Sequence, residues 1–322
     1  MPRPHAPRTR VSTYLSEWMP LGDVTRQSVA GYFAGGTGVS YLNSINKFTF
    51  STEAISTTSA VLSGNIIAQA GFANSAVAGY SLGGFNDSTY TALTTIDKVS
   101  FPADTKTSST VLTTAKDLLA GFSNTGVAGY VGGGRNSAGA KTNNVEKLTY
   151  PSETSSAVSA TLTSATMQMT GFSNYGVAGY FVGGVDSAGK VTSVDKFAFP
   201  TDTKTNLATA TLGFNRTALQ DQGVSGYVMG GEDNVGAVVT LCEKFAFSTD
   251  TKTTTTSLAV VSSQGFGASS SGVAGYYAGG IDSTEYNTIY KFTFPSDTRS
   301  LLSAVLTTAK RSGGSFSNEG TF

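Results

Sequence analysis

The chain has 322 residues, a formal net charge of zero at pH 7 and 13% charged residues, against roughly 25% in an average globular protein. Its polar surface must be built mostly from uncharged side chains, which supply no field to hold a polyanion, so no nucleic acid partner is expected. His5 is the only histidine and Cys242 the only cysteine, which excludes an internal disulfide and, in the body of the chain, a Ser-His-Asp triad or a His-rich zinc site.

Residues 1–27 precede the repeats that fill the rest of the chain. They begin with an extended basic segment, MPRPHAPRTR, followed by the apolar stretch YLSEWMPLG. Three arginines are thin support for a nucleic acid contact, whereas the apolar side chains favour docking, either on the body of this protein or on a partner protein. The residues predicted for this docking arm are Arg3, Arg8, Arg10, Tyr14, Trp18 and Met19.

Membrane segments are not predicted anywhere in the chain. No apolar run approaches the roughly 20 residues that cross a bilayer. The basic N-terminal residues are not followed by the apolar segment of a secretory signal peptide. We therefore expect no membrane insertion.

One glycine-rich stretch, GVAGYFVGG, recurs six times from residue 28 onward. Its Gly-Tyr pairs begin at Gly31, Gly79, Gly129, Gly179, Gly226 and Gly275, at intervals of 47 to 50 residues. A dinucleotide-binding loop needs G-x-G-x-x-G between a strand and a helix. Here the Gly-Gly is followed each time by a loop and another strand, so the glycines are predicted to let neighbouring strands approach closely. A nearly constant period with the same Gly-Tyr and Gly-Gly pairs indicates repeated supersecondary units.

Each unit contains four strand-like pieces, which we call strands a to d. Strand a carries GFSN, strand b carries VAGYxxGG, and strand c alternates apolar and polar residues, as in SVDKFAF. A tight turn such as FPTDT follows, where Pro presets φ and the acidic or hydroxyl side chain can bond nearby backbone. Strand d is rich in Thr, Ser, Ala and Val, and SNxG then forms a hairpin turn from strand a into the next strand b.

Four antiparallel strands in about 50 residues match a propeller blade. The order also resembles the kelch motif, with Lys116, Arg216 and Lys310 near the basic residue that often precedes the next blade. The kelch tryptophan is missing, since the only tryptophan, Trp18, lies outside the repeats. We therefore predict an all-β fold over residues 28–322, a six-bladed β-propeller of four-stranded antiparallel blades.

Closure of the ring is predicted from the two ends of the repeats. The first unit lacks its own strand a, because residues 24–27 read VTRQ where other units read GFSN. Residues 316–320, FSNEG, match strand a but precede no strand b. The C-terminal segment is therefore predicted to complete the first blade, which removes open sheet edges.

The loops between strands b and c vary most and lie on the same propeller face as the d–a loops. Their Asn or Asp after the Gly-Gly is explained either by an Asx turn or by a polar ring at the channel mouth. Aromatic rings with amides and carboxylates suit glycan binding, and loops on a rigid scaffold commonly carry binding residues. The candidate ligand-binding residues are Tyr41, Phe85, Asn86, Tyr90, Arg135, Asn136, Asp186, Glu232, Asp233, Asp282 and Tyr286.

Six strand-c lysines and the cysteine have structural explanations. The lysines, Lys47, Lys98, Lys147, Lys196, Lys244 and Lys291, alternate with apolar residues, so we expect packed stems with the ammonium bonded to a carboxylate or carbonyl. Adjacent strand residues point to opposite faces. A lysine must therefore pair with a neighbouring strand or blade rather than with the acidic residue before it. Cys242 falls where other units carry Ile or Val and is predicted to be a small buried hydrophobe.

The sequence pattern of these units resembles repeats in tail-fibre and other virion proteins of tailed bacteriophages, including those of cyanobacteria. The pattern is GYFxGG, then xDKFxF, then PxDT and a Thr-rich run. The resemblance covers about residues 28–322. It implies a virion component that is made in the host cytoplasm and exposed extracellularly. The arm of residues 1–27 is then expected to bind other virion proteins, and the propeller to face host glycans or neighbouring subunits.

Three functions follow for testing. The first is a non-enzymatic structural or adhesive virion protein; the second is a cellular kelch-like scaffold that binds proteins; the third is a propeller glycosidase or lyase. Against an enzyme stand the missing histidines and the absence of sialidase-type Asp boxes, although glycosidases can work with two carboxylates alone. No catalytic residue, metal or cofactor is predicted, and the oligomeric state is left open.

Overall fold

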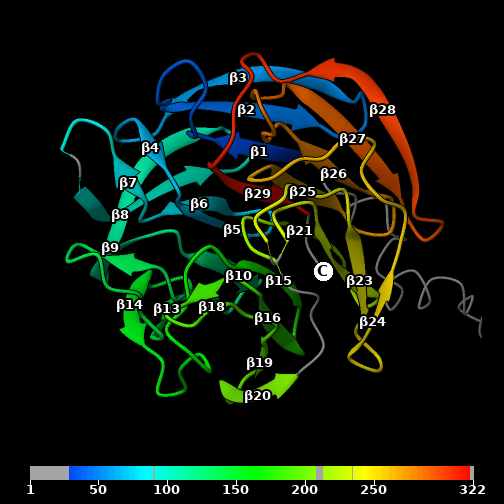
Figure 1. Ribbon diagram of the computed structural model, residues 1–322. Helices are drawn as coiled ribbons and strands as arrows, with labels where there is room; N and C mark the ends of the chain where they lie inside the picture. The colour runs from blue at the N-terminus through cyan, green and yellow to red at the C-terminus, as the bar shows by residue number, and fades with distance from the viewer. Residues whose placement is uncertain (1–28, 90, 208–212, 234, 320–322) are drawn as a thin grey trace, which may run out of the picture.

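In the computed structural model, residues 29–89, 91–207, 213–233 and 235–319 are described, and they form an all-β propeller without a helix. The predicted docking arm, with Arg3, Arg8, Arg10, Tyr14, Trp18 and Met19, lies outside the described residues, as does Tyr90. The inner strands surround the middle of Figure 1 and the outer strands form its rim.

Strands a and b make the inner half of each unit. Strands a are β29 (Gly314–Asn318), β5 (Ala70–Asn74), β10 (Ala120–Asn124), β15 (Thr170–Asn174), β21 (Thr217–Asp221) and β25 (Phe266–Ser270). Strands b are β1 (Ala30–Ala34), β6 (Ala78–Leu82), β11 (Ala128–Gly132), β16 (Ala178–Val182), β22 (Ser225–Met229) and β26 (Ala274–Ala278). Every residue of every strand b is buried, because neighbouring units cover both of its faces.

Strands c and d make the outer half. Strands c are β2 (Ser44–Thr49), β8 (Thr91–Ser100), β13 (Val145–Thr149), β19 (Val194–Ala198), β23 (Cys242–Ala246) and β27 (Thr288–Thr293). Strands d are β3 (Ala54–Val61), β9 (Thr105–Asp117), β14 (Thr154–Ala157), β20 (Thr203–Leu207), β24 (Thr251–Thr254) and β28 (Thr298–Val305). Short strands in the b–c and d–a loops are β4 (Ile66–Ile67), β7 (Phe85–Asn86), β12 (Arg135–Asn136), β17 (Val185–Asp186) and β18 (Gly189–Lys190).

The prediction of six four-stranded blades is wrong in number. Five sheets are four-stranded antiparallel blades, such as β15-β16-β19-β20, whereas the strands of the second unit belong to a seven-stranded sheet. In that unit β8 and β9 are 10 and 13 residues long, so they extend beyond the strands of the other blades. The end of β9 pairs with β12 of the next unit, and β8 also pairs with β7.

The predicted closure by the C-terminal segment is confirmed. Strand β29 pairs antiparallel with β1, from Ala30 opposite Asn318 to Ala34 opposite Gly314. The ring of Phe316 stacks on that of Tyr32 with centroids 5.2 Å apart. The first blade therefore combines the two ends of the described chain, and its inner edge is not left unpaired.

Close packing explains the repeated glycine before the tyrosine. A Cβ on Gly79 would lie 2.0 Å from the ring of Phe316, and one on Gly129 would lie 2.0 Å from the ring of Phe72. Both rings come from strand a of the preceding unit, so the glycine makes room for its neighbour's core aromatic. Cys242 is buried as predicted, and burial raises the pKa of its thiol to about 12.

The six strand-c lysines join the units, as predicted. Each ammonium lies 2.5 to 2.9 Å from a carboxylate in the c–d turn of the next unit around the ring: Asp104, Glu153, Asp202, Asp250, Asp297 and Glu53. In five units the strand-b tyrosine hydroxyl donates to the same carboxylate, as Tyr130 does to Asp202 at 2.7 Å. The acid of the turn motif therefore reaches across to a neighbouring blade. The last of these pairs, Lys291 with Glu53, links the sixth unit to the first.

Candidate functional site

The two ends of the axial channel define two faces of the molecule. The face that carries the b–c and d–a loops is here called the loop face. The face that carries the a–b and c–d turns is called the turn face. Between them the strands a line a cavity of about 180 Å³, which is large enough to hold several water molecules.

A closed circle of backbone hydrogen bonds surrounds the channel on the loop face. One residue of each d–a loop donates its N–H to the carbonyl of the equivalent residue in the preceding loop, at 2.7 to 3.1 Å. These residues are Ala68, Leu118, Gln168, Asn215, Gln264 and Ser312, each with φ between 54° and 59°. We call them the loop ring. A left-handed conformation is uncommon outside glycine, and here it turns each N–H toward the neighbouring loop.

The side chains of the loop ring are polar in some units and apolar in others. Gln168 donates to Asn215 Oδ1 at 2.9 Å, and Asn215 donates to Glu232 Oε1 at 2.8 Å. Ala68 and Leu118, by contrast, are apolar. The predicted ligand residue Glu232 thus lies beside the ring and is held by an amide from its own unit.

Four of the predicted loop residues form Asx turns, which was the alternative to a polar ring at the channel mouth. The Oδ1 atoms of Asn86, Asn136, Asp186 and Asp233 accept the backbone N–H two residues onward at 2.8 to 3.0 Å. These turns shape the loops, so the oxygens are engaged within the loop itself. Arg135 is also engaged, because its guanidinium donates two hydrogen bonds to the Asp117 carboxylate, at 3.1 and 2.6 Å.

Arg311 brings the loops of the first and sixth units together. Its backbone bridges Thr37, which also bridges the predicted residue Tyr41. Its Nε lies 3.4 Å from Glu285, next to the predicted residue Tyr286. This connection was not visible in the sequence, because the first and sixth loops are far apart along the chain.

The sixth-unit loop holds two predicted residues near one another. Burial is the main cause that raises the pKa of Tyr286, and the negative charge of Asp282 adds to it. Asp282 itself is exposed. Both residues belong to the b–c loop of the sixth unit, whose Glu285 pairs with Arg311. Phe85, in contrast, lies in β7, which pairs with β4 and β8 of the seven-stranded sheet.

Small polar groups line the channel between the two faces. Serine hydroxyls accept hydrogen bonds from backbone N–H groups of the neighbouring strand a: Ser269 Oγ accepts the N–H of Gln220 at 2.9 Å, and Ser317 Oγ accepts that of Ser269 at 2.9 Å. Among the described residues, Gln69 Oε1 and Thr217 Oγ1 are buried without a hydrogen-bond partner, and both residues line the cavity. Water or a small polar molecule could satisfy them.

Three large polar side chains converge at the turn-face end of the channel. The hydroxyl of Tyr175 donates to Glu319 Oε2 at 3.1 Å, and Gln220 Nε2 donates to Tyr175 Oη at 3.0 Å. Glu319 is 1% exposed, and burial raises the pKa of its carboxyl to about 8, with Asp221 adding to the shift. A carboxyl with this pKa is largely protonated at neutral pH and can donate as well as accept hydrogen bonds.

Sequence reasoning missed this cluster, although a signal was present. Tyr175 and Glu319 occupy the same position of the a–b turn, directly after the Asn of SNxG. The six residues there are Ser75, Thr125, Tyr175, Gln222, Ser271 and Glu319. A position that varies more than its neighbours from unit to unit is a candidate for contact with something other than the repeat itself.

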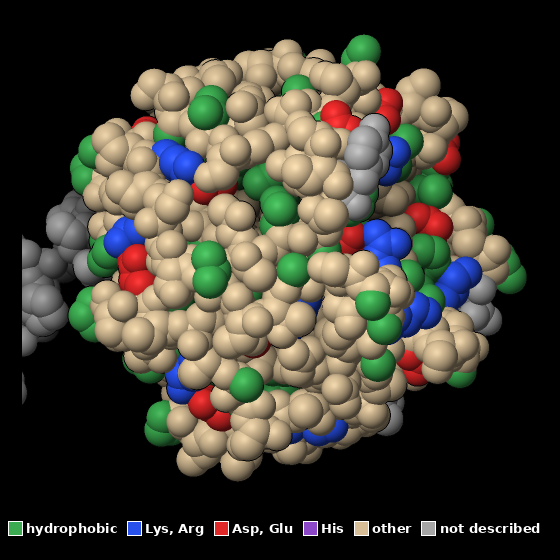
Figure 2. Space-filling model, turned by 90° about the vertical axis from the view of Figure 1, so that its left-hand side faces the viewer, with side chains coloured by type: hydrophobic (Ala, Val, Ile, Leu, Met, Phe, Trp, Pro, Cys, Tyr) green, Lys and Arg blue, Asp and Glu red, His purple; other side chains and the backbone are tan. Residues whose placement is uncertain are grey.

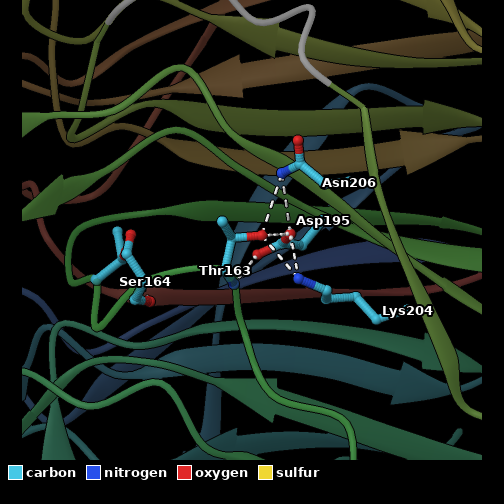
Figure 3. A network of polar contacts seen from close by, with 6 residues as sticks. Thr163, Ser164, Asp195, Lys204 and Asn206 are labelled. Atoms are coloured by element: carbon cyan, nitrogen blue, oxygen red, sulfur yellow. Dashed lines mark hydrogen bonds and ion pairs between the residues drawn. The ribbon is translucent and has the colours of Figure 1, made fainter.

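Figure 3 shows a Thr–Asp–Lys cluster that resembles a catalytic arrangement but repeats in the fold. Thr163 donates its N–H and hydroxyl to Asp195 at 2.8 and 2.5 Å, and Lys204 donates to Thr163 Oγ1 at 2.7 Å. The same arrangement joins Ser63, Asp97 and Lys106 elsewhere in the ring: Ser63 Oγ lies 2.5 Å from Asp97, and Lys106 lies 2.6 Å from Ser63. Since each cluster joins the d–a segment of one unit to strand c of the next, we interpret it as a contact between units.

Buried basic residues reinforce the same contacts. Lys116 lies 2.7 Å from Glu146, with both side chains almost fully buried, and Arg216 lies 2.7 Å from Glu243. Lys310 donates to the carbonyl of Phe33 at 2.9 Å, and burial lowers its pKa to about 7. The three basic residues near the kelch position are thus buried between strands rather than presented to a ligand.

No metal site is found in the part of the chain that the structure describes, where no three His, Cys, Asp or Glu residues are grouped suitably. Within the same residues no helix is long and apolar enough to span a membrane. Figure 2 shows a side of the molecule dominated by uncharged polar side chains and backbone, with Lys, Arg, Asp and Glu in small mixed groups.

Comparison with known proteins does not extend the assignment beyond the fold. No protein-family model matches the chain, and no curated protein matches it either. The class of protein that the described residues define is therefore a β-propeller with a polar channel and a variable loop face.

Proposed function

We propose that the protein is a non-enzymatic virion protein, of tail-fibre or surface-decoration type, that binds host-surface glycan through its loop face. The kelch-like order of the units and their resemblance to phage virion repeats support this role. Other virion proteins are the proposed partners of residues 1–27, and the protein is exposed extracellularly on the particle. A cellular kelch-like scaffold is the second candidate.

One observation carries the proposal: Arg311 joins the loops of the first and sixth units, and these loops carry Tyr41, Asp282 and Tyr286. Two phenol rings and a carboxylate on neighbouring loops can stack on a sugar and accept its hydroxyl hydrogens. The low charge of the chain suits neutral, hydroxyl-rich ligands better than polyanions.

Many carboxylates are already committed to contacts within the propeller. Six lie in the c–d turn ion pairs, and Asp97, Glu146, Asp195 and Glu243 are at most 3% exposed. A glycosidase needs two carboxyl groups that flank the scissile bond. The proposed site has Asp282 and Glu285, and Glu285 is paired with Arg311, which favours binding over hydrolysis.

The test is a binding screen against immobilised bacterial surface polysaccharides, with release of reducing ends followed in the same samples. We expect binding without release, and a loss of at least tenfold in affinity (about 1.4 kcal/mol) in Tyr41→Ala/Tyr286→Ala. The matched control is Val235→Ala, because Val235 is exposed in another b–c loop, and it should bind normally.

Each other outcome counts against the proposal in its own way. Release of reducing ends makes the protein an enzyme. Equal binding by the double variant and the control moves the site away from the first and sixth loops. Absence of binding across the panel favours the protein scaffold.

A further inference from the structure

The loop ring is polar along one arc and apolar along the other. Its polar members follow one another around the channel and are here called the polar arc: Gln168, Asn215, Gln264 and Ser312. Ala68 and Leu118 complete the circle, and their backbone N–H groups donate at 2.7 and 2.8 Å, as short as any bond in it. The circle therefore closes without polar side chains, so those of the polar arc are not required to hold it together.

Two glutamines of the polar arc are held by neighbours at one end of the amide only. Gln168 Nε2 donates to Asn215 Oδ1 at 2.9 Å. Gln264 Oε1 accepts from Arg311 Nη1 at 2.6 Å and from the hydroxyl of Ser312. The other ends, Gln168 Oε1 and Gln264 Nε2, have no hydrogen-bond partner in the part of the chain that the structure describes. Both side chains are partly exposed, so one acceptor and one donor are left for a ligand.

The groups between the two ends of the polar arc are uncharged amides. Glu232 lies beside Asn215 and accepts from its amide at 2.8 Å. Arg311 lies beyond Gln264, with its Nε 3.4 Å from Glu285. Hydroxyl groups both donate and accept hydrogen bonds, so they fit an amide row of this kind better than an ion does.

Arg311 connects the polar arc to the proposed glycan site. Its Nη1 donates to Gln264, and its Nε contacts Glu285, the residue before Tyr286. Neighbouring chains joined by backbone hydrogen bonds stand about 5 Å apart, so two steps around a six-membered circle, from Gln264 to Gln168, cover roughly 8–9 Å. The polar arc therefore extends the site along the channel mouth, over a length that fits linked sugars rather than a single ring.

We infer that the polar arc is a second part of the glycan site, where Gln264 Nε2 donates to, and Gln168 Oε1 accepts from, the hydroxyls of a second sugar. The inference rests on the proposed function and adds the class of its ligand, a chain of at least two neutral sugars. The backbone circle and the side-chain bonds fix both amides before a ligand arrives, which lowers the entropy cost of binding.

Gln264→Glu is the sharpest test, because it keeps Oε1 as the acceptor for Arg311 and Ser312 and replaces only the free Nε2 donor by an oxygen. The probes are the same immobilised bacterial surface polysaccharides. We expect the affinity to fall about tenfold, since a hydrogen bond to the ligand is lost and an acceptor is left against its oxygen. Thermal melting checks that the variant remains folded.

The charge-matched control is Leu118→Glu. Leu118 stands opposite Gln264 in the loop ring, on the apolar arc, so the variant adds the same charge at the same position of another unit. It should bind like the unmodified protein.

Gln168→Met tests the other free group, because methionine has a similar length and lacks the Oε1 acceptor. We expect about a fivefold loss of affinity for the loss of one hydrogen bond. Leu118→Met is the matched control at the same position of the neighbouring unit, and it should bind normally.

Ligand length gives a readout that the polar arc alone should move. Partial acid hydrolysis of the bound polysaccharide supplies mono- and disaccharide fragments. Affinity should rise at least tenfold from the mono- to the disaccharide in the unmodified protein. In Gln264→Glu that gain should largely disappear.

The results separate this inference from the proposed function. Normal binding by Gln264→Glu and Gln168→Met, together with a loss in Tyr41→Ala/Tyr286→Ala, overturns the role of the polar arc and leaves the proposed function in place. An equal loss in Leu118→Glu attributes the effect to added charge and also overturns it. Absence of binding to every polysaccharide overturns both.

Discussion

The two faces of the propeller are made by the same six units, yet they differ in how far the units vary. On the turn face, each unit repeats the same exposed valine and the same carboxylate-to-lysine contact with its neighbour. On the loop face, the backbone hydrogen bonds repeat around the loop ring, but the side chains change from Leu118 to Gln264. Contacts that hold neighbouring units together are therefore repeated, whereas side chains on the loop face differ from unit to unit.

The strongest way to break the repeated contacts is to remove the closing strand. Deletion of residues 313–322 takes away β29, which leaves the inner edge of β1 unpaired and removes Phe316 from the core. We expect the protein to unfold or aggregate, because an open edge recruits other chains. Thermal melting and size-exclusion chromatography measure this, and an unchanged melting temperature would contradict the assignment of β29 as the closing strand.

A buried ion pair between units should give the next largest effect. Glu146→Leu strands the buried ammonium of Lys116 and should cost about 3–5 kcal/mol of unfolding free energy. Lys116→Met/Glu146→Leu should recover much of that loss, since no uncompensated charge remains. Urea denaturation measures both.

The control is Glu285→Gln on the loop face, where the pair with Arg311 is about 30% exposed on both sides. It should cost less than about 1 kcal/mol. A double variant at Lys116 and Glu146 that is as unstable as the sum of two single variants would show that the buried charges are not coupled.

Glu319 should make stability depend on pH at the turn-face end of the channel. Its folded pKa of about 8 lies above the ordinary value of 4.5, so the folded state retains a proton that the unfolded state loses. This stabilising contribution is full below pH 4.5 and declines as pH rises to 8, by up to a few kcal/mol at about 1.4 kcal/mol per unit.

Glu319→Gln cannot titrate, so its unfolding free energy should fall less than that of the unmodified protein between pH 4.5 and 8. The difference between the two curves isolates this carboxyl from all others. Parallel curves for the two proteins over that range would refute a buried, protonated Glu319.

The smallest expected losses of unfolding free energy are those of two Asp→Asn variants, one on each face. Asp202→Asn weakens the acceptor shared by Lys147 and Tyr130 on the turn face, and we expect a loss of roughly 1–2 kcal/mol for this charge-assisted contact. Asp282→Asn on the loop face should change stability by less than about 0.5 kcal/mol. If denaturation gives equal losses at both positions, the repeated turn-face contacts are not what stabilises the ring.

Much of this fold could be predicted from the sequence because each unit repeats its own turn and strand chemistry. The four strands of each unit, the C-terminal closure and the pairing of strand-c lysines with another blade were all predicted and are confirmed. The prediction that the second unit forms a four-stranded blade is wrong, since the lengths of β8 and β9 depend on pairing with β7 and with β12 of the next unit.

The candidate sites could be predicted only in part. The variable loops were predicted to surround the channel mouth, and the Asx-turn alternative is confirmed at Asn86, Asn136, Asp186 and Asp233. The sequence could not show that Arg311 joins the first and sixth loops. Nor could it show that Tyr175 meets Glu319, 144 residues away, because no local pattern relates the two.

The sequence by itself determined the repeated unit, its strands and the way in which the ring closes, because these follow from spacing, alternation and turn residues within about 50 positions. Only the tertiary structure decided which side chains face one another across the channel and between loops. Those contacts depend on where each strand a stands around the axis. That arrangement is set by packing between units, such as Gly79 against Phe316, and not by any neighbour along the chain.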